Sequence, residues 1–122
     1  MAEEKGFRGL KVWQRGKVLA VKVYEISGKG RFCSDHSLQD QMRRAAVSIP
    51  SNIAEGDTLG TDKQSIRHFR IAKGSCAELM TQLEIAQEIG YITQDALVEI
   101  QEECLGVSGM LQRLISARSK VQ

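Results

Sequence analysis

Apolar residues recur at helical spacing in four long segments of this 122-residue chain. On a helical wheel drawn at about 100° per residue, each segment has one narrow apolar arc, which is the pattern of an amphipathic helix. The chain contains a single proline, whereas a β-sandwich or barrel usually needs many Pro and Gly turns. The pattern predicts an all-α protein with helices at about residues 7–26, 37–55, 62–89 and 94–118.

The apolar arcs define an expected core. The residues that we expect to be mostly buried are Trp13, Ile49, Ile53, Phe69, Leu83 and Leu111. Tyr24 lies on the arc of the first segment, and Cys76 and Cys104 lie on the arcs of the third and fourth. Free cysteines are among the most buried residues, so we expect these two to pack as small apolar side chains.

Pro50 falls inside the second segment. Within a helix, proline lacks the N–H that would pair with the Ala46 carbonyl, and its ring crowds that carbonyl and kinks the helix. Alternatively, Ser48 is an N-cap and the segment is two short helices. Because the apolar arc keeps its phase from Leu38 through Ile53, we favour one helix kinked at Pro50.

Short turn-forming stretches separate the four segments. The expected turn glycines are Gly28, Gly30, Gly56, Gly60 and Gly90. Thr61 or Asp62 is the expected N-cap of the third helix, and Thr93 that of the fourth. Short connections make consecutive helices antiparallel neighbours, so we predict one domain over residues 1–122, an antiparallel up-down-up-down four-helix bundle.

The chain shows no pattern typical of an enzyme, a metal site or a cofactor site. Cys33, Cys76 and Cys104 have no CxxC spacing, and the two histidines stand at unrelated spacings. The Glu-x-x-His pairs of di-iron bundles do not occur, and the Gly28–Gly30 stretch is no P-loop. We therefore expect a non-enzymatic protein with no metal and no cofactor.

Unpaired cysteines favour a reducing compartment, so we expect a cytoplasmic protein. No apolar run approaches the ~20 residues of a membrane span, and no signal-peptide pattern opens the chain. We expect no membrane partner.

Charge is unevenly distributed along the chain. Residues 1–73 carry 14 basic and 8 acidic side chains, whereas residues 74–122 carry 3 basic and 7 acidic ones. The third segment begins basic and ends acidic, which is the reverse of what the helix macrodipole favours. We therefore expect another interaction to account for this order of charges. The residues are Lys63, Arg67, Arg70 and Lys73 at the start and Glu78, Glu84 and Glu88 at the end.

A basic stripe follows the first segment away from its core face. Its members are Arg8, Lys11, Arg15 and Lys22, with Lys29 and Arg31 in the connection that follows. Such a stripe can neutralise the phosphates of RNA or DNA, chiefly through Lys11, Arg15 and Lys22. Aromatics are only 5% of the chain, so we expect binding that tolerates different sequences. Alternatively, the stripe is a solvated face or pairs with the acidic half of another helix.

A polar stripe lies beside the apolar arc of the second segment. It consists of Gln41, Arg44, Ser48, Asn52 and Glu55. Amide, hydroxyl, guanidinium and carboxylate groups together suit an interhelical or intersubunit hydrogen-bond network. A solvated face with local pairs such as Asp40–Arg44 is the alternative.

Outward-facing apolar residues predict self-association. They are Leu10, Val18 and Val21 on the first segment and Ile85 and Ile89 on the third. Exposed apolar clusters mark interfaces, and the oppositely charged halves of the third helix could order neighbouring copies. The competing hypothesis is a structural or protein-interaction module, an accessory subunit whose partner is another protein.

Residues 41–56, which read QMRRAAVSIPSNIAEG, closely resemble the signature of the 23S rRNA intervening-sequence family. The IAKGS stretch at 71–75, LKVW at 10–13 and GYI at 90–92 match it as well. The resemblance implies a four-helix bundle, a ring of five subunits and no established enzymatic activity. A related group resembles the accessory proteins of diversity-generating retroelement reverse transcriptases, which are basic and bind nucleic acid.

Overall fold

The computed structural model describes residues 6–59 and 61–119, which form helices and no strand. The α-helices are α1 (Lys11–Ser27), α2 (His36–Thr58), α3 (Asp62–Glu88) and α4 (Gln94–Ser119). Two short 3-10 helices, η1 (Gly6–Gly9) and η2 (Gly30–Ser34), precede α1 and α2. The prediction of an all-α protein with four α-helices is confirmed, although residues 7–9 belong to η1 and not to α1.

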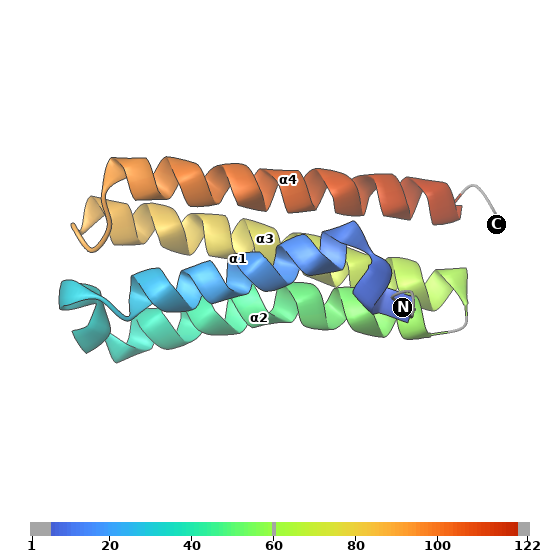
Figure 1. Ribbon diagram of the computed structural model, residues 1–122, viewed down its shortest axis with the longest axis horizontal. Coiled ribbons are helices and arrows are strands. Elements are labelled where there is room, and N and C mark those ends of the chain that lie inside the picture. The colour runs from blue at the N-terminus through green and yellow to red at the C-terminus, as the bar shows by residue number, and fades with distance from the viewer. Residues whose placement is uncertain (1–5, 60, 120–122) are drawn as a thin grey trace, which may run out of the picture.

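The four helices lie side by side along one long axis (Figure 1). α1 packs against α2 and α4, and α3 packs against the same two helices, so α1 and α3 occupy opposite corners of the bundle. The contacts between α2 and α3 run in opposite sequence order, from Ser48 with Ser75 to Asn52 with His68. Along α1, Arg15 lies beside Gly106 of α4, and Lys22 lies beside Glu103 and Glu99, so the contacts of this pair also run in opposite sequence order.

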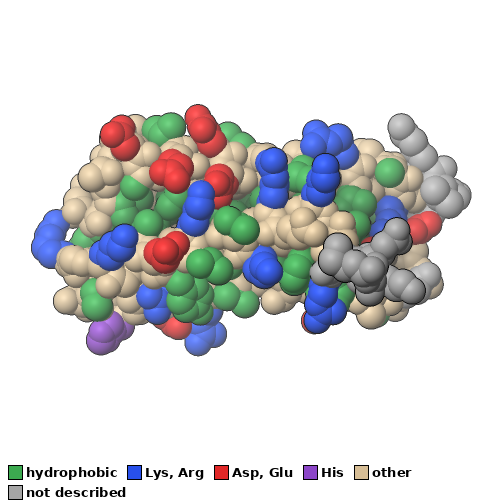
Figure 2. Space-filling view, in the orientation of Figure 1, with side chains coloured by type: hydrophobic (Ala, Val, Ile, Leu, Met, Phe, Trp, Pro, Cys, Tyr) green, Lys and Arg blue, Asp and Glu red, His purple; other side chains and the backbone are tan. Residues whose placement is uncertain are grey.

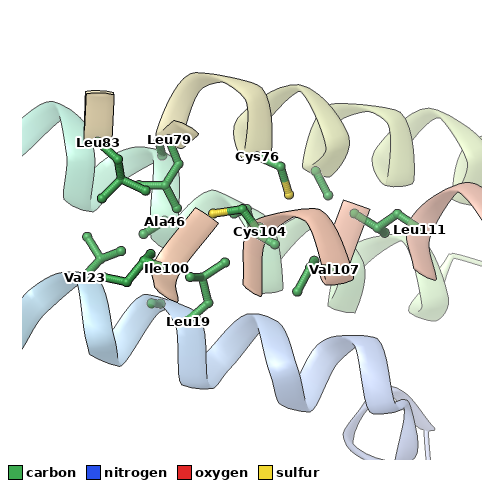
Figure 3. Close-up of a cluster of buried hydrophobic side chains, with 14 of the residues drawn as sticks. Leu19, Val23, Ala46, Cys76, Leu79, Leu83, Ile100, Cys104, Val107 and Leu111 are labelled. Atoms are coloured by element: carbon green, nitrogen blue, oxygen red, sulfur yellow. The ribbon is translucent and has the colours of Figure 1, made fainter. Parts of the chain in front are cut away.

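Apolar side chains from all four helices meet in one core (Figure 3). Ile49, Ile53, Phe69, Leu83 and Leu111 are fully buried, as the apolar arcs predict. Trp13 is only partly buried, because it lies at the edge of the α1 arc.

The prediction that Tyr24 belongs to the core is wrong, since 45% of this residue is exposed. Its ring lies on the α2 side of α1 and stacks against the Arg43 guanidinium, 4.4 Å from the ring centroid. The prediction that Leu10 faces outward is also wrong, because Leu10 packs against the core and is partly buried.

The α1–α2 connection contains a core residue that the helical pattern does not reveal. Phe32 of η2 is fully buried, and its ring lies 5.1 Å from that of Tyr91 in the α3–α4 turn. The Tyr91 hydroxyl donates a 2.8 Å hydrogen bond to the Asp35 carboxylate, which also accepts from the Leu38 N–H as the N-cap of α2. Two connections distant in sequence are thereby joined at one end of the bundle.

These hydrogen bonds predict a pH dependence of stability. The bond from the Leu38 N–H, followed by the bond from Tyr91, lowers the pKa of Asp35 below its usual value of 3.8. The stabilisation by the ionised carboxylate is therefore complete above pH 3.8 and is lost as the pH falls through the lowered folded-state pKa. Urea unfolding of Asp35→Asn, which keeps a capping oxygen, should show less loss of stability below pH 4 than the parent; identical pH profiles would contradict this.

α2 continues as one helix through Pro50 to Thr58. One helix instead of two is thus confirmed, and a kink at Pro50 stays a prediction. The expected turn at Gly56 is wrong, because Gly56 lies inside α2 and is buried against α3. A Cβ atom at this position would lie 2.8 Å from Cε1 of Phe69, so the missing side chain allows the two helices to approach closely.

Substituting helical glycines tests this close approach. Gly56→Ala should lower the free energy of unfolding by about 1–3 kcal/mol, because the added methyl overpacks the Phe69 ring. Gly109→Ala in α4 is the matched control, since the nearest atom to its Cβ is Arg113 Nη1 at 4.0 Å. It should raise stability by up to about 1 kcal/mol through helix propensity. Urea unfolding measures the change in the free energy of unfolding for each variant. Equal changes for Gly56→Ala and Gly109→Ala would contradict the packing argument.

The N-caps predicted for α3 and α4 are present as hydrogen bonds to threonine hydroxyl groups. The Thr61 hydroxyl accepts from the Gln64 N–H at the start of α3, and the Thr93 hydroxyl accepts from the Ala96 N–H at the start of α4. Gly90, with φ +84°, follows the end of α3, as expected. No helix within the described residues is long and apolar enough to cross a membrane.

Candidate nucleic-acid interface

The structure divides the six cations of the predicted basic stripe. Lys22 is half-buried between α1 and α4, where its Nζ lies 2.6 Å from a Glu103 oxygen and 3.5 Å from a Glu99 oxygen. The hydrogen bond to Glu103 raises the pKa of Lys22. This lysine pairs with the acidic half of another helix, which was the alternative interpretation, and its inclusion among the principal phosphate contacts is corrected.

Arg31 and Lys29 lie near the α3–α4 turn and the start of α4, at the same end of the bundle as Lys22. Arg31 Nη2 donates to the carbonyls of Ile89 and Gly90 at 3.1 and 3.4 Å, and its guanidinium lies over the Tyr91 ring. Arg31 therefore anchors the end of α3. Lys29 is exposed, but it lines a shallow hollow together with acidic Glu25 and Glu99 as well as Lys22.

The remaining three cations of the predicted stripe lie in η1 and in the first half of α1. Arg8 lies in η1 with its guanidinium 4.7 Å from the Phe7 ring centroid, and Lys11 and Arg15 are exposed on α1. Arg15 reaches across to α4, where its Nη1 lies 3.8 Å from the position of a Cβ on Gly106. Among the described residues, no acidic side chain forms an ion pair with these three cations.

A cation on α4 joins this group. Arg113 is exposed, lines one hollow with Lys11, and has no ion-pair partner in the described part of the chain. Its Nη1 lies beside Gly109, one helical turn from Gly106, where Arg15 lies. We call Lys11, Arg15 and Arg113 the α1/α4 basic face; Arg8 precedes it in η1. The basic stripe predicted from the sequence follows the first segment and the connection after it, so Arg113 of α4 was not among its members.

The fold converts the charge gradient along the chain into a difference between the two ends of the bundle. The end made of residues 6–18, 47–59, 61–75 and 106–119 holds ten basic and three acidic side chains, a net charge of +7. The other end, residues 19–46 and 76–105, holds five basic and ten acidic ones, a net charge of −5. Along α4, at the top of Figure 2, acidic side chains gather at the left and basic ones further right.

Three members of the predicted polar stripe connect α2 to α3. The Ser75 hydroxyl donates to the Ser48 hydroxyl at 2.8 Å, and the Asn52 amide donates to the same hydroxyl at 3.0 Å. His68 Nδ1 lies 3.0 Å from Asn52 Oδ1 and 3.3 Å from a Glu55 oxygen. The chain of contacts runs from buried Ser75 to exposed Glu55 and fixes the register of the two helices.

The other two members of the stripe lie outside this chain of contacts. Arg44 is exposed and pairs at 2.9 Å with Asp40 one turn earlier in α2, which is the local alternative and not a contact to another helix. Gln41 is exposed at the surface of α2. The described contacts of the stripe are therefore interhelical for Ser48, Asn52 and Glu55 only.

A second polar cluster, which the sequence did not predict, joins α2, α3 and α4 at the basic end of the bundle. Arg118 of α4 donates to the Ser65 hydroxyl at 3.0 Å and pairs with Asp57 of α2 at 3.3 Å. Its guanidinium also lies 5.3 Å from the centroid of the Phe69 ring. Because these partners satisfy Arg118, it is a structural residue and not part of the α1/α4 basic face.

The buried thiols offer little chemistry. Burial raises the pKa of Cys76 to about 11 and that of Cys104 to about 12, so both stay protonated at neutral pH. Within the described residues, no group of three histidine, cysteine or acidic side chains could hold a metal ion.

Comparison with known proteins gives the chain a family. Residues 8–113 match the model of the 23S rRNA-intervening sequence protein family. A protein of unknown function of the S23 ribosomal protein family from Bacteroides thetaiotaomicron has a similar crystal structure, with a TM-score of 0.79 and 21% identity. The match covers 85% of this chain and 97% of that one. No curated protein matches the sequence. Since the family model covers most of the chain, the protein belongs to the 23S rRNA-intervening sequence protein family.

Proposed function

We propose that the protein is a non-enzymatic nucleic-acid-binding subunit that contacts phosphates through the α1/α4 basic face. The observation that carries this proposal is the position of Lys11, Arg15 and Arg113. These cations lie together on two adjacent helices, are exposed, and form no ion pair with a described acidic residue. Cations with this freedom can release the counterions of a phosphate backbone, which drives nucleic-acid binding.

The form of the face favours backbone contacts over base readout. Gly106 and Gly109 carry no side chain, and the guanidinium groups of Arg15 and Arg113 lie beside them on the surface of α4. Guanidinium groups match phosphate oxygens in two-point hydrogen bonds, and few aromatic residues are available to stack on bases. We therefore infer a structured RNA or a duplex DNA as the partner, bound with little sequence preference. The family name favours RNA over DNA.

Self-association would raise the avidity of the α1/α4 basic face for nucleic acid. A ring of five subunits, which the family resemblance implies, stays a prediction. If one nucleic acid reaches several copies of the face, avidity can exceed the affinity of one copy by about 10²–10⁴-fold. A relation to the retroelement accessory proteins would be consistent with the same activity and also stays a prediction.

A protein partner is the second candidate function. Val18 and Val21 are 48% and 55% exposed on the outer side of α1, where an apolar partner surface could cover them. This candidate makes a different prediction, because an apolar interface responds little to salt whereas phosphate binding weakens steeply with salt.

A titration tests the proposal. Fluorescence anisotropy with a labelled RNA hairpin and a labelled DNA duplex should show binding of both at 50 mM salt and a marked loss at 200 mM salt. A binding isotherm that is flat at 50 mM salt for both probes would contradict nucleic-acid binding. The protein-partner candidate would then take its place.

A further inference from the structure

A shallow hollow opens on the α1/α4 basic face, and we call it the α1/α4 hollow. Its volume is about 280 Å³, and its walls come from the start of α1 and from the last turns of α4. Lys11 and Arg113 of the α1/α4 basic face line it. The other lining residues are all apolar: Leu10, Val12, Met110, Leu114 and Ala117. The hollow is therefore an apolar surface bordered by two cations that the proposed function assigns to phosphate contacts.

The apolar lining of the α1/α4 hollow continues the core to the surface. Val12 belongs to the core, and Met110 and Leu114 pack against the core while they stay partly exposed. Ala117 is exposed on α4 and is the smallest side chain of the lining. A ligand in the hollow would cover this apolar surface, and removal of apolar surface from water favours binding.

The size of the α1/α4 hollow suits one planar group. Pockets for drug-sized ligands measure about 300–1,000 Å³, so a hollow of about 280 Å³ lies at the lower limit of that range. A nucleobase is a single planar group, and proteins that bind an extruded base hold its flat faces between aromatic or apolar side chains. The apolar lining offers that kind of contact without an aromatic residue.

The charges at the rim favour a nucleotide over an apolar protein side chain. Lys11 comes from α1 and Arg113 from α4, so each wall of the α1/α4 hollow contributes one exposed cation. Within a nucleic-acid strand, a nucleotide has a phosphate on each side of its sugar, and these phosphates stay outside when the base enters a pocket. Arg15, one turn after Lys11 on α1, lies where the strand continues. An apolar protein side chain would fill the hollow but would leave the cations without a partner.

We propose that the α1/α4 hollow binds one unpaired nucleobase of a structured RNA, while Lys11 and Arg113 contact the phosphates on either side of it. This inference rests on the proposed function and narrows the partner to RNA in which a bulge or loop adjoins a duplex. A bulged base is already unpaired, so turning it out of the stack costs little. Among the described side chains of the lining, only the two cations can form hydrogen bonds, so the hollow accepts a base without reading its identity.

Three RNA hairpins that differ at one position test this inference. The first has a bulged adenosine, the second has an abasic nucleotide at the same bulge, and the third is fully paired. Fluorescence anisotropy with the full chain at 50 mM salt should show that the adenosine bulge binds about tenfold more tightly than the other two hairpins, because only this hairpin supplies an unpaired base. The abasic bulge keeps the bend of the hairpin and the phosphates, so it separates base binding from recognition of RNA shape.

Two variants change the α1/α4 hollow and leave the α1/α4 basic face unchanged. Ala117→Phe fills the hollow from an exposed position, and Met110→Gln makes its lining polar at nearly constant side-chain length. Each should remove most of the advantage of the adenosine bulge, while the Kd for the paired hairpin stays within about threefold of the parent value because the phosphate contacts remain. Ser116→Phe places the same ring on the neighbouring residue, outside the lining, and should keep the advantage. Circular dichroism checks that all three variants remain helical.

The outcomes separate base binding from phosphate binding. Equal affinity for the three hairpins, or an abasic bulge that binds as tightly as the adenosine bulge, would overturn base binding and leave the proposed function standing. An adenosine advantage that persists in both Ala117→Phe and Met110→Gln would also overturn the assignment of the base to this hollow. If none of the hairpins binds at 50 mM salt, both the inference and the proposed function are overturned, and the hollow is assigned to an apolar side chain of a protein partner.

Discussion

Replacing Phe69 by alanine should lower the free energy of unfolding by about 3–5 kcal/mol. The ring is fully buried between α2 and α3 and fills the space that Gly56 leaves open. It also lies under the Arg118 guanidinium, so its removal leaves that cation beside a cavity. Loss of buried apolar surface and creation of a cavity therefore act together.

Urea unfolding followed by circular dichroism measures this loss, with all variants at one protein concentration because self-association would add to apparent stability. Phe7→Ala is the matched control. Phe7 is only partly buried, and its principal contacts are an edge-on pair with Trp13 and the Arg8 guanidinium. Its loss should cost less than the loss of Phe69, since the aromatic pair adds only about 0.5–1.5 kcal/mol to the burial of a half-exposed ring. Equal losses for the two variants would show that Phe69 is not the centre of the core.

Reversing Lys11 and Arg15 together to glutamate should weaken RNA binding on the order of a hundredfold at low salt, because two phosphate contacts are lost and two repulsive charges are added. Both side chains are exposed and neither has a described ion-pair partner, so the fold should tolerate the change. Fluorescence anisotropy gives the Kd, and circular dichroism checks that helicity is retained.

The control for this variant changes net charge equally at the other end of the bundle. Lys29→Glu/Arg44→Glu reverses two exposed cations that lie near acidic residues. If Lys11 and Arg15 bind phosphate, the control should bind within about threefold of the parent once long-range screening is allowed for. Equal weakening by both variants would mean that net charge, and not the α1/α4 basic face, governs binding.

Helical periodicity predicted the four helices and most of the core, because each apolar arc persists over several turns. Ile49 and Ile53 kept the phase of the second arc across Pro50, and α2 is indeed one helix. Thr61 and Thr93 were predictable as caps for a local reason: a hydroxyl just before a helix satisfies a free N–H.

Helical periodicity did not predict the roles of Phe32 and Gly56. A core residue in a connection and a glycine at a helix–helix contact leave no periodic pattern in the sequence. Phe32 is an isolated apolar residue in a connection, and only the tertiary contact with Tyr91 shows that it is core. Glycine is equally compatible with a turn and with a close helix contact. The neighbouring Phe69 ring decides in favour of the contact, and no local pattern at Gly56 shows that ring.

The candidate site was predicted only in part, because charge pairing depends on which residue of a neighbouring helix lies opposite. Arg15 and Lys22 stand two helical turns apart on nearly the same side of α1. Arg15 meets Gly106 of α4 and stays exposed, whereas Lys22 meets Glu103 and is neutralised. The register of α1 against α4 makes this difference, and the sequence of α1 alone does not contain it.

The salt dependence of RNA binding tests the nucleic-acid proposal most directly. Plotting the logarithm of the binding constant against the logarithm of salt concentration gives the number of phosphates neutralised. The parent should show a steep negative slope, and Lys11→Glu/Arg15→Glu should reduce its magnitude by about 2, one for each lost phosphate contact. Parallel lines for parent and variant, or a parent slope near zero, would contradict phosphate binding by the α1/α4 basic face.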